Sequence, residues 1–420
     1  MPASPEPPTY FRKGFGLKAE VQDELAADYD GYVVDLLRGG DYRLTVGDVT
    51  IKLAREFGFC YGVERAVEYA YQTRRKFPDR RIVLVGEIIH NPHVNARLEQ
   101  MGVEILRRPA PTTPFDFSGI GAEDAVILPA FGVTIADFDA LRTIGCVLVD
   151  TTCGSVLNVW KRVESYARGG FTALIHGKHY HEETRATASQ VGKYPHGHYI
   201  IVRDMSEARL VCDFIEGKVD ACAISSAFAH AVSHGFDPSR HLQRIGVANQ
   251  TTMLARESLA IADEVAAAIE RARGTEARSS DFRSFDTICS ATQERQDAVR
   301  DLLDDDVDLM VVIGGFNSSN TMSLASLCAD RVPTYHIESS AAIDPAARTI
   351  HHRPAGKLHS EADLENWLPA AAVCVGITAG ASTPNNRIGD VVARILRTRG
   401  LSLPNVVEPP ARSAQDHSTV

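Results

Sequence analysis

The sequence lacks long apolar runs and any excess of positive charge. No stretch approaches the roughly 18 consecutive apolar residues of a membrane-spanning helix, and the start of the chain, MPASPEPPTYFRKGFG, lacks the apolar centre of a secretory signal. The formal net charge of −10 argues against a general nucleic-acid binder but leaves room for a small basic pocket. We therefore expect a cytoplasmic protein with neither a membrane nor a nucleic acid as partner.

Closely spaced cysteines are also absent. The eight cysteines, at positions 60, 146, 153, 212, 222, 289, 328 and 374, include no C-x-x-C pair. This spacing argues against a zinc ribbon and against a ferredoxin-type run, because the ligands of both lie close together in sequence. A cytoplasmic chain of 420 residues does not need a disulfide framework. Any metal site must therefore be assembled from distant segments.

Apolar, β-rich runs alternate with polar turns and helical patterns along most of the chain. The runs are RIVLVG, DAVILPA, CVLVD, FTALIHG, YIIV, DLMVVIGG and AAAVCVGIT. Such alternation predicts parallel sheets covered by helices, and the length suggests two to three domains. Ligands bind beyond the carboxyl ends of parallel strands, so the polar segments after the runs are candidate contacts, although similar segments are ordinary turns and helix caps.

The ends of the chain differ from this pattern. Residues 1–47 begin with proline and charge and continue as a short helix and connector. We interpret them as an extension that is packed on, or loosely attached to, the main body. Residues from about 404, PNVVEPPARSAQDHSTV, have the composition of a disordered tail.

Three cysteines recur in one local setting. Cys60 lies in FGFCYGVERAVEYAY, at the start of a helix whose apolar residues fall on one face. Cys153, in VLVDTTCGSVLNVWKRVESYA, and Cys289, in FDTICSATQERQDAVRDLL, also lie between a strand and a helix. Successive positions are separated by about one α/β unit, which suggests three similar domains whose cysteines meet at a shared centre.

Three such thiolates suit either one zinc ion with an open position or a cubane cluster with one open iron. The cluster fits better for two reasons. Three distant cysteines without a histidine would be unusual ligands for a catalytic zinc ion, and three helix N-termini would favour the negative charge of a cluster. A buried core position remains the alternative for any one of the three, and we interpret the other five cysteines as mostly core residues.

Eight motifs then occur in the order in which one known family has them. They are GFCYGVERA, HNPHV, DTTC, HEET, NQTT, DTICSATQERQDA, GGFNSSNT and TAGASTP, across about residues 48–395. With these motifs the chain resembles the 4-hydroxy-3-methylbut-2-enyl diphosphate reductase family, the last enzymes of the methylerythritol phosphate route to isoprenoids, in its longer plant-like branch. The resemblance implies three similar α/β domains with parallel sheets, in a pseudo-three-fold trefoil around a central iron–sulfur cluster. The expected divisions are 1–47 (extension), 48–152, 153–288, 289–395 and 396–420 (tail).

The resemblance also implies roles for individual residues. Cys60, Cys153 and Cys289 would hold one [4Fe-4S] cluster, which leaves one iron for the hydroxyl group of the substrate. Glu183 would deliver a proton, with its neighbour Glu182 a much weaker candidate, and Thr251 would help to hold the hydroxyl end. The residues expected around the diphosphate are His90, His181, Ser318, Ser319, Asn320 and Ser382.

The implied activity is the reductive removal of a hydroxyl group from 4-hydroxy-3-methylbut-2-enyl diphosphate, giving isopentenyl and dimethylallyl diphosphate. Donors on strand-end loops and helix N-termini can bind the diphosphate without a large basic patch. A ferredoxin- or flavodoxin-type protein would supply the electrons. One position departs from the family pattern, because Phe131 stands where much of the family has a diphosphate-binding histidine; Lys178 or His179, nearby in sequence, could compensate.

Two other functions stay open. A zinc-dependent hydrolase would use the histidines of HNPH and HGKHYHEE, but the sequence has no H-E-x-x-H motif and the three cysteines would have no role. A non-enzymatic scaffold that carries a cluster or a phosphate group would bind the diphosphate without turning it over.

Overall fold

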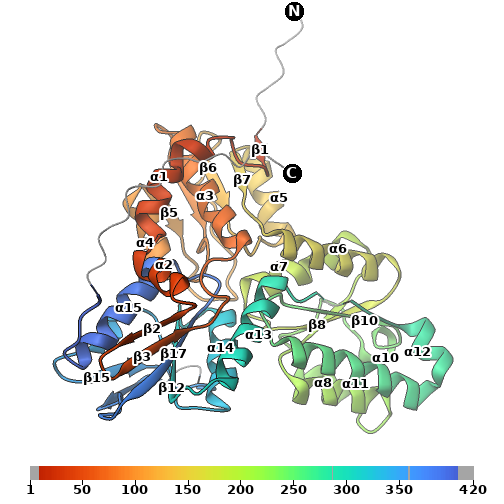
Figure 1. The fold of residues 1–420 in the computed structure, drawn as a ribbon. Coiled ribbons are helices and arrows are strands. Elements are labelled where there is room, and N and C mark those ends of the chain that lie inside the picture. Colours follow the sequence, from red (N-terminus) through yellow and green to blue (C-terminus); the bar gives the residue numbers. More distant parts are fainter. Residues whose placement is uncertain (1–8, 286, 358–359, 405–420) are drawn as a thin grey trace, which may run out of the picture.

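The computed structural model describes residues 9–285, 287–357 and 360–404. They form three α/β lobes around a common centre, each built on its own largely parallel sheet (Figure 1). The third lobe carries in addition a small antiparallel sheet. Among the helices of the described residues, none has the length and apolarity needed to cross a bilayer.

The first lobe contains a parallel sheet in the order β1-β7-β6-β4-β5. Its strands are β1 (Tyr10–Phe11), β4 (Ile82–Val85), β5 (Val103–Leu106), β6 (Ala125–Leu128) and β7 (Val147–Asp150), and its helices are α1 (Lys18–Tyr29), α3 (Tyr61–Lys76), α4 (Pro92–Gln100) and α5 (Ile135–Ile144). β4, β6 and β7 are buried along their whole length, as expected of parallel strands covered on both faces.

The second lobe contains a parallel sheet in the order β11-β10-β8-β9. Its strands are β8 (Thr172–His176), β9 (Tyr199–Val202), β10 (Ile245–Asn249) and β11 (Phe282–Ser284). Its helices are α6 (Gly154–Arg168), α7 (Glu182–Ser189), η1 (Gln190–Lys193), α8 (Met205–Ile215), α9 (Ala221–Ala227), α10 (Pro238–His241), α11 (Ala255–Arg273) and α12 (Thr275–Asp281). One apolar core joins the sheet to α6, α8 and α11.

The third lobe contains a sheet in the order β13-β12-β17-β3-β2, in which only the edge strand β2 is antiparallel. Its strands are β2 (Arg43–Val46), β3 (Val49–Leu53), β12 (Leu309–Ile313), β13 (Thr334–Ile337) and β17 (Val373–Ala379); the small sheet is β14 (Ile343–Asp344), β15 (Thr349–His352) and β16 (Ala362–Glu365). Its helices are α2 (Tyr32–Gly39), α13 (Ser290–Asp304), α14 (Ser319–Ala329), η2 (Ser340–Ala342) and α15 (Asn385–Thr398).

Each of the three cysteines lies where the chain passes from one lobe to the next. Cys60 follows β3 of the third sheet and precedes α3, whose apolar face packs in the first lobe. Cys153 follows β7 of the first sheet and precedes α6 of the second core. Cys289 follows β11 of the second sheet and precedes α13, which packs in the third lobe. This repeated crossing produces the pseudo-three-fold relation, and the predicted three-lobed fold is confirmed.

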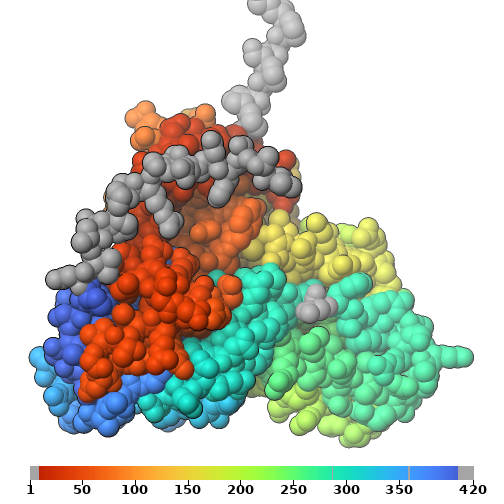
Figure 2. All heavy atoms as spheres, viewed as in Figure 1, coloured from red at the N-terminus to blue at the C-terminus, as the bar shows by residue number. Residues whose placement is uncertain are grey.

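The strand pairing bears on the division expected at residue 48. β3 pairs in parallel with β17, more than 300 residues later, and Figure 2 shows the red-orange segment of β2 and β3 against the blue C-terminal part of the third lobe. Residues 49–53 therefore lie in the third sheet rather than with residues 61–152. The division of the chain into domains stays a proposal, and this pairing moves its first boundary toward Cys60.

The N-terminal extension is packed on the main body in the part that the structure describes. β1 pairs with β7, and Val21 and Tyr29 of α1 are buried in the first core. Val33, Val34 and Leu37 of α2 are buried in the third core. The alternative of a loosely attached extension is therefore wrong for residues 9–47, while residues 1–8 and the predicted disordered tail from 405 onward lie outside the described residues.

The cysteines expected in the core mostly lie there. Cys146, Cys212 and Cys328 are buried, and Cys374 is partly buried. Cys222 is exposed, so the core interpretation is wrong for this residue. The reason is local, because α9 is a short surface helix in which Ile224 is the only buried residue.

Candidate functional site

One cavity where the three lobes meet is bordered by every residue to which the resemblance gave a role. These residues are Cys60, His90, Cys153, His181, Glu183, Thr251, Cys289, Ser318, Ser319, Asn320 and Ser382. They lie on loops and helix starts that follow strands of all three sheets, as expected for ligand contacts in parallel α/β folds. The structure brings these positions together, whereas their individual roles stay proposals.

The three cysteines occupy equivalent positions at one end of the cavity. Cys60, Cys153 and Cys289 are the N-cap residues of α3, α6 and α13, each with an extended backbone and without a side-chain cap bond. A Cβ atom added at Gly62 would lie 2.5 Å from Sγ of Cys153 and 3.9 Å from Sγ of Cys60, so glycine leaves the room that the sulfurs need. Ser155 Oγ donates a hydrogen bond of 3.4 Å to Sγ of Cys289. We refer to this region as the sulfur end.

Burial disfavours the charged thiolates at the sulfur end, and nearby groups offset part of this effect. Burial raises the pKa of the Cys60 and Cys153 thiols. The backbone N–H of Val63 and the positive charge of Arg295 oppose this rise at Cys60. Arg295 is buried and donates a hydrogen bond of 2.7 Å to the carbonyl oxygen of Gly58, in the loop before Cys60. A metal centre would complete these interactions by replacing the thiol protons.

The spacing of the sulfur atoms favours a cluster over a single ion. A tetrahedral zinc ion with bonds of about 2.3 Å would hold its sulfurs about 3.8 Å apart. In the described part of the chain, the cysteines form no set of three ligand atoms within 4.8 Å of one another. The donor set is therefore wider than one zinc ion requires, and it fits a larger group that takes one sulfur from each lobe.

Glu183 is the buried carboxyl group of the cavity. It lies in the first turn of α7, is 1% exposed, and accepts a hydrogen bond of 2.6 Å at Oε1 from the backbone N–H of Thr251. Burial raises the pKa of Glu183 to about 7. The carboxyl group is thus partly protonated near neutral pH, which is the state that a general acid needs.

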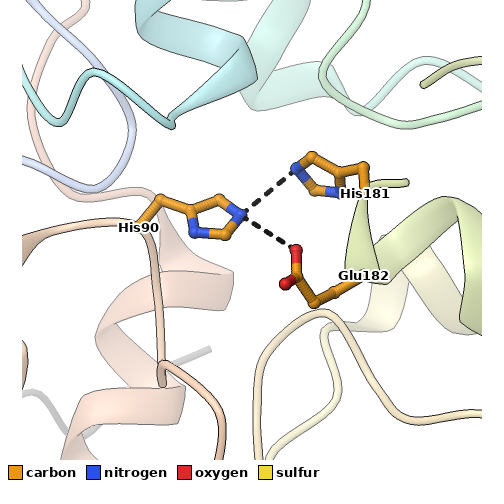
Figure 3. Close-up of side chains that lie close together, drawn as sticks. All are labelled: His90, His181 and Glu182. Atoms are coloured by element: carbon orange, nitrogen blue, oxygen red, sulfur yellow. Dashed lines mark hydrogen bonds and ion pairs between the residues drawn. The ribbon is translucent and has the colours of Figure 1, made fainter. Parts of the chain in front are cut away.

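His90 and His181, which line the same cavity, meet side by side (Figure 3), and we call this part of the cavity the imidazole end. Their Nε2 atoms are 3.2 Å apart, and Nε2 of His90 lies 3.6 Å from Oε2 of Glu182. Nδ1 of His90 lies 2.8 Å from Oε2 of Glu87. Burial lowers the pKa of His181 well below its usual value, so its imidazole is neutral. Because Nδ1 of His181 accepts the backbone N–H of Glu183, its proton is on Nε2, which donates toward Nε2 of His90.

The same end contains a group that could hold one metal ion. The ligand atoms of His90, His181 and Glu182 all lie within 4.8 Å of one another, which is the geometry that the zinc hydrolase alternative needs. However, the guanidinium of Arg108 lies 3.3 Å from Oε1 of Glu182 and already balances this carboxylate. A cation bound here would face that positive charge, and the sulfur end would have no role.

Phe131 covers the two histidines. Its ring stacks on His90 with the centroids 4.3 Å apart and meets the edge of His181 at 5.7 Å. Phe131 offers no hydrogen-bond donor, as the sequence predicted, and its ring instead restrains the orientation of both imidazoles.

The N-terminus of α14 also faces the imidazole end. Ser318 is its N-cap residue. Asn320 is 2% exposed, and its Oδ1 accepts the N–H of Ala381 at 2.9 Å, whereas its Nδ2 has no hydrogen-bond partner in the described structure. Ser382 Oγ donates a hydrogen bond of 3.1 Å to the carbonyl oxygen of His90. An unused amide donor beside a helix N-terminus makes this corner suitable for an anion.

The sequence analysis missed the residues that support the site. Arg295 had a signal, because it lies three or four residues from Thr292 and Val299 on the same buried helical face, where an arginine is unexpected. Glu87 and Ser155 had none, because acidic and hydroxyl side chains are ordinary in strand-end loops and first helical turns.

A trefoil of parallel-sheet lobes, with one cysteine from each lobe at a shared cavity, defines a class of three-lobed α/β protein with a sulfur-lined centre. The family model described as LytB protein matches residues 51–396. The chain belongs to this family.

Two relatives that match nearly the whole chain carry one name. A protein of Thermosynechococcus vestitus is 47% identical over 395 residues, with 94% of this chain and 96% of the relative covered. A protein of Gloeobacter violaceus is 46% identical over 397 residues, with 93% of each chain covered. Both are named 4-hydroxy-3-methylbut-2-enyl diphosphate reductase.

Solved structures agree with the fold. A structure described as (E)-4-hydroxy-3-methyl-but-2-enyl diphosphate reductase, the terminal enzyme of the non-mevalonate pathway, aligns with a TM-score of 0.50 and 27% identity over 82% of this chain and 98% of that chain. The corresponding Plasmodium falciparum reductase aligns with a TM-score of 0.60 over 82% of this chain and 87% of that chain; at 20% identity it supports the fold alone.

Proposed function

We propose that this chain is a 4-hydroxy-3-methylbut-2-enyl diphosphate reductase. The observation that carries the proposal is the single cavity that joins three cysteines, a buried carboxyl group and an anion-binding corner. In the reaction the bond between carbon and the hydroxyl oxygen breaks, two electrons and two protons enter, and water leaves. The second proton adds to one or the other terminal carbon of the allylic group, which gives isopentenyl or dimethylallyl diphosphate.

We propose that Cys60, Cys153 and Cys289 hold one [4Fe-4S] cluster. When bound, such a cluster supplies electrons one at a time and an iron with Lewis acidity toward the hydroxyl oxygen. An electron donor of the ferredoxin or flavodoxin type would reduce it.

The remaining residues have roles that follow from their positions. Glu183 lines the same cavity as the three cysteines and has a pKa of about 7, so it can deliver the proton that converts the departing hydroxyl group to water. Thr251 orients this carboxyl group through its backbone N–H. The neutral imidazole of His181, the Asn320 amide and the first turn of α14 would receive the diphosphate.

The test is anaerobic purification followed by metal and sulfide analysis and a turnover assay with an artificial reductant. We expect iron and acid-labile sulfide in about equal amounts and formation of both products. Zinc without iron would favour the hydrolase alternative, and a cluster-containing protein that binds the substrate without converting it would favour the scaffold.

A further inference from the structure

Lys178 places a positive charge beside the anion-binding corner. It follows β8 of the second lobe, and its Nζ donates a hydrogen bond of 3.2 Å to Oγ of Ser319 at the start of α14 in the third lobe. Its other contact is a weak one of 3.9 Å to the sulfur of Met322. The ammonium group thus crosses between two lobes at the helix end that borders the cavity.

In the described part of the chain, no carboxylate balances this charge. Within the described residues, no acidic oxygen lies within 4 Å of Nζ of Lys178, and burial alone lowers the pKa of Lys178 to about 8. Lys52 shows the usual arrangement for a half-buried lysine, with an ion pair of 3.2 Å to Asp305. A mostly buried ammonium without a counter-charge costs free energy, which an anionic ligand would recover.

The imidazole end needs such a charge. His181 is neutral, Phe131 is apolar, and Arg108 is already balanced by Glu182. Glu87 adds a second carboxylate beside His90. A diphosphate in this corner would therefore lie near the carboxylate of Glu87, and a further positive charge would offset this repulsion.

We propose that the ammonium group of Lys178 binds the diphosphate of the substrate, together with Ser319 and the N-terminus of α14. The inference rests on the proposed reductase function and adds to it the group that supplies fixed positive charge. Lys178 itself lines a neighbouring cavity, which Lys357 also lines and which shares Ser319 with the central cavity, so the experiment must place the effect of Lys178 at the substrate.

The test compares Lys178→Met and Lys178→Arg with the wild-type holoenzyme. KM for the substrate and Kd for inorganic pyrophosphate should both rise about 10- to 100-fold in Lys178→Met, as for a lost hydrogen bond to a charged group, while kcat and the visible spectrum stay within a few-fold of wild type. Lys178→Arg should recover most of the affinity, because the charge is retained. Lys52→Met controls for loss of a half-buried lysine, and Lys357→Met controls for the second cavity.

Three outcomes decide the inference. Wild-type KM and pyrophosphate affinity in Lys178→Met would overturn it, and so would equal losses in Lys357→Met, which would place the anion in the outer cavity. Lys178→Arg could also keep an intact visible spectrum and recover no affinity for the substrate or for pyrophosphate. That result would show that the shape of lysine matters and not its charge, and it would also overturn the inference. A wild-type protein that binds pyrophosphate through Lys178 but reduces no substrate would refute the reductase proposal and leave the anion site standing.

Discussion

The two ends of the central cavity are built in different ways. At the sulfur end one local arrangement, a strand followed by an N-cap cysteine and a helix, occurs once at each crossing between lobes. At the imidazole end the groups come from unlike loops, after β4, β8, β12 and β17, and they depend on contacts between lobes. The sulfur end can therefore be recognised by repetition, whereas the imidazole end exists only when the lobes are assembled.

The largest effect should follow from a change at the sulfur end. Cys153→Ser replaces one of three equivalent N-cap sulfurs and leaves the helix start intact. If all three cysteines share one cluster, this variant should lose most of its iron and nearly all turnover. The measurements are iron content and activity after anaerobic purification.

Cys374→Ser is the matched control, because Cys374 is partly buried in β17 and does not border the cavity. It should keep its iron and its activity. A Cys153→Ser protein with normal iron and normal turnover would show that the three positions are not equivalent, and the three-ligand model would be wrong.

A smaller but still large effect is expected from a change at Glu183. Glu183→Gln keeps the acceptor oxygen for the N–H of Thr251 but removes the transferable proton. Turnover should fall about 10²- to 10⁴-fold, the usual contribution of general acid–base catalysis, with little change in the cluster spectrum or substrate affinity.

Two variants control this prediction. Glu257→Gln changes a half-buried carboxyl group outside the cavity whose pKa is also raised, and it should have little effect. Glu182→Gln should change KM rather than kcat, because Glu182 contacts His90 and Arg108. An inactive Glu182→Gln beside an active Glu183→Gln would reverse the assignment of the proton donor.

The contrast between the sulfur end and the imidazole end also explains which features could be predicted from the sequence. The N-cap positions of Cys60, Cys153 and Cys289 follow from local apolar patterns, and the motifs identified every residue that borders the cavity with a proposed role. The pairing of β3 with β17 was missed, because VTIKL contains nothing that identifies a partner more than 300 residues away. The contact of Lys178 with Ser319 joins two lobes, and only the assembled fold reveals it.

A moderate effect on stability should distinguish Glu183 from an exposed acid. Its pKa is raised from 4.5 to about 7, so the folded protein holds a proton that the unfolded chain releases between these pH values. The stabilisation from this proton is fully present below pH 4.5 and is lost as pH rises through 7, on the order of 3 kcal/mol in all. Glu183→Gln cannot ionise, so its stability relative to wild type should increase between pH 5 and pH 8. Denaturation followed at several pH values checks this, and a constant difference would contradict the burial argument.

The smallest effect is expected at the imidazole end, from Phe131→His. An imidazole can keep the stacking on His90, at 4.3 Å in the present ring pair, and adds a donor near the proposed diphosphate. KM should therefore stay the same or fall a few-fold, with kcat unchanged. Phe131→Ala is the control, because it removes the ring that restrains both histidines and should raise KM.

The double variant Phe131→His with Lys178→Met sharpens the comparison. If the new histidine and Lys178 bind the same anion, the histidine should recover part of the affinity that the lysine provided. A large loss of turnover in Phe131→His with an intact cluster would show instead that Phe131 is a packing residue, and that the imidazole end tolerates substitution no better than the sulfur end.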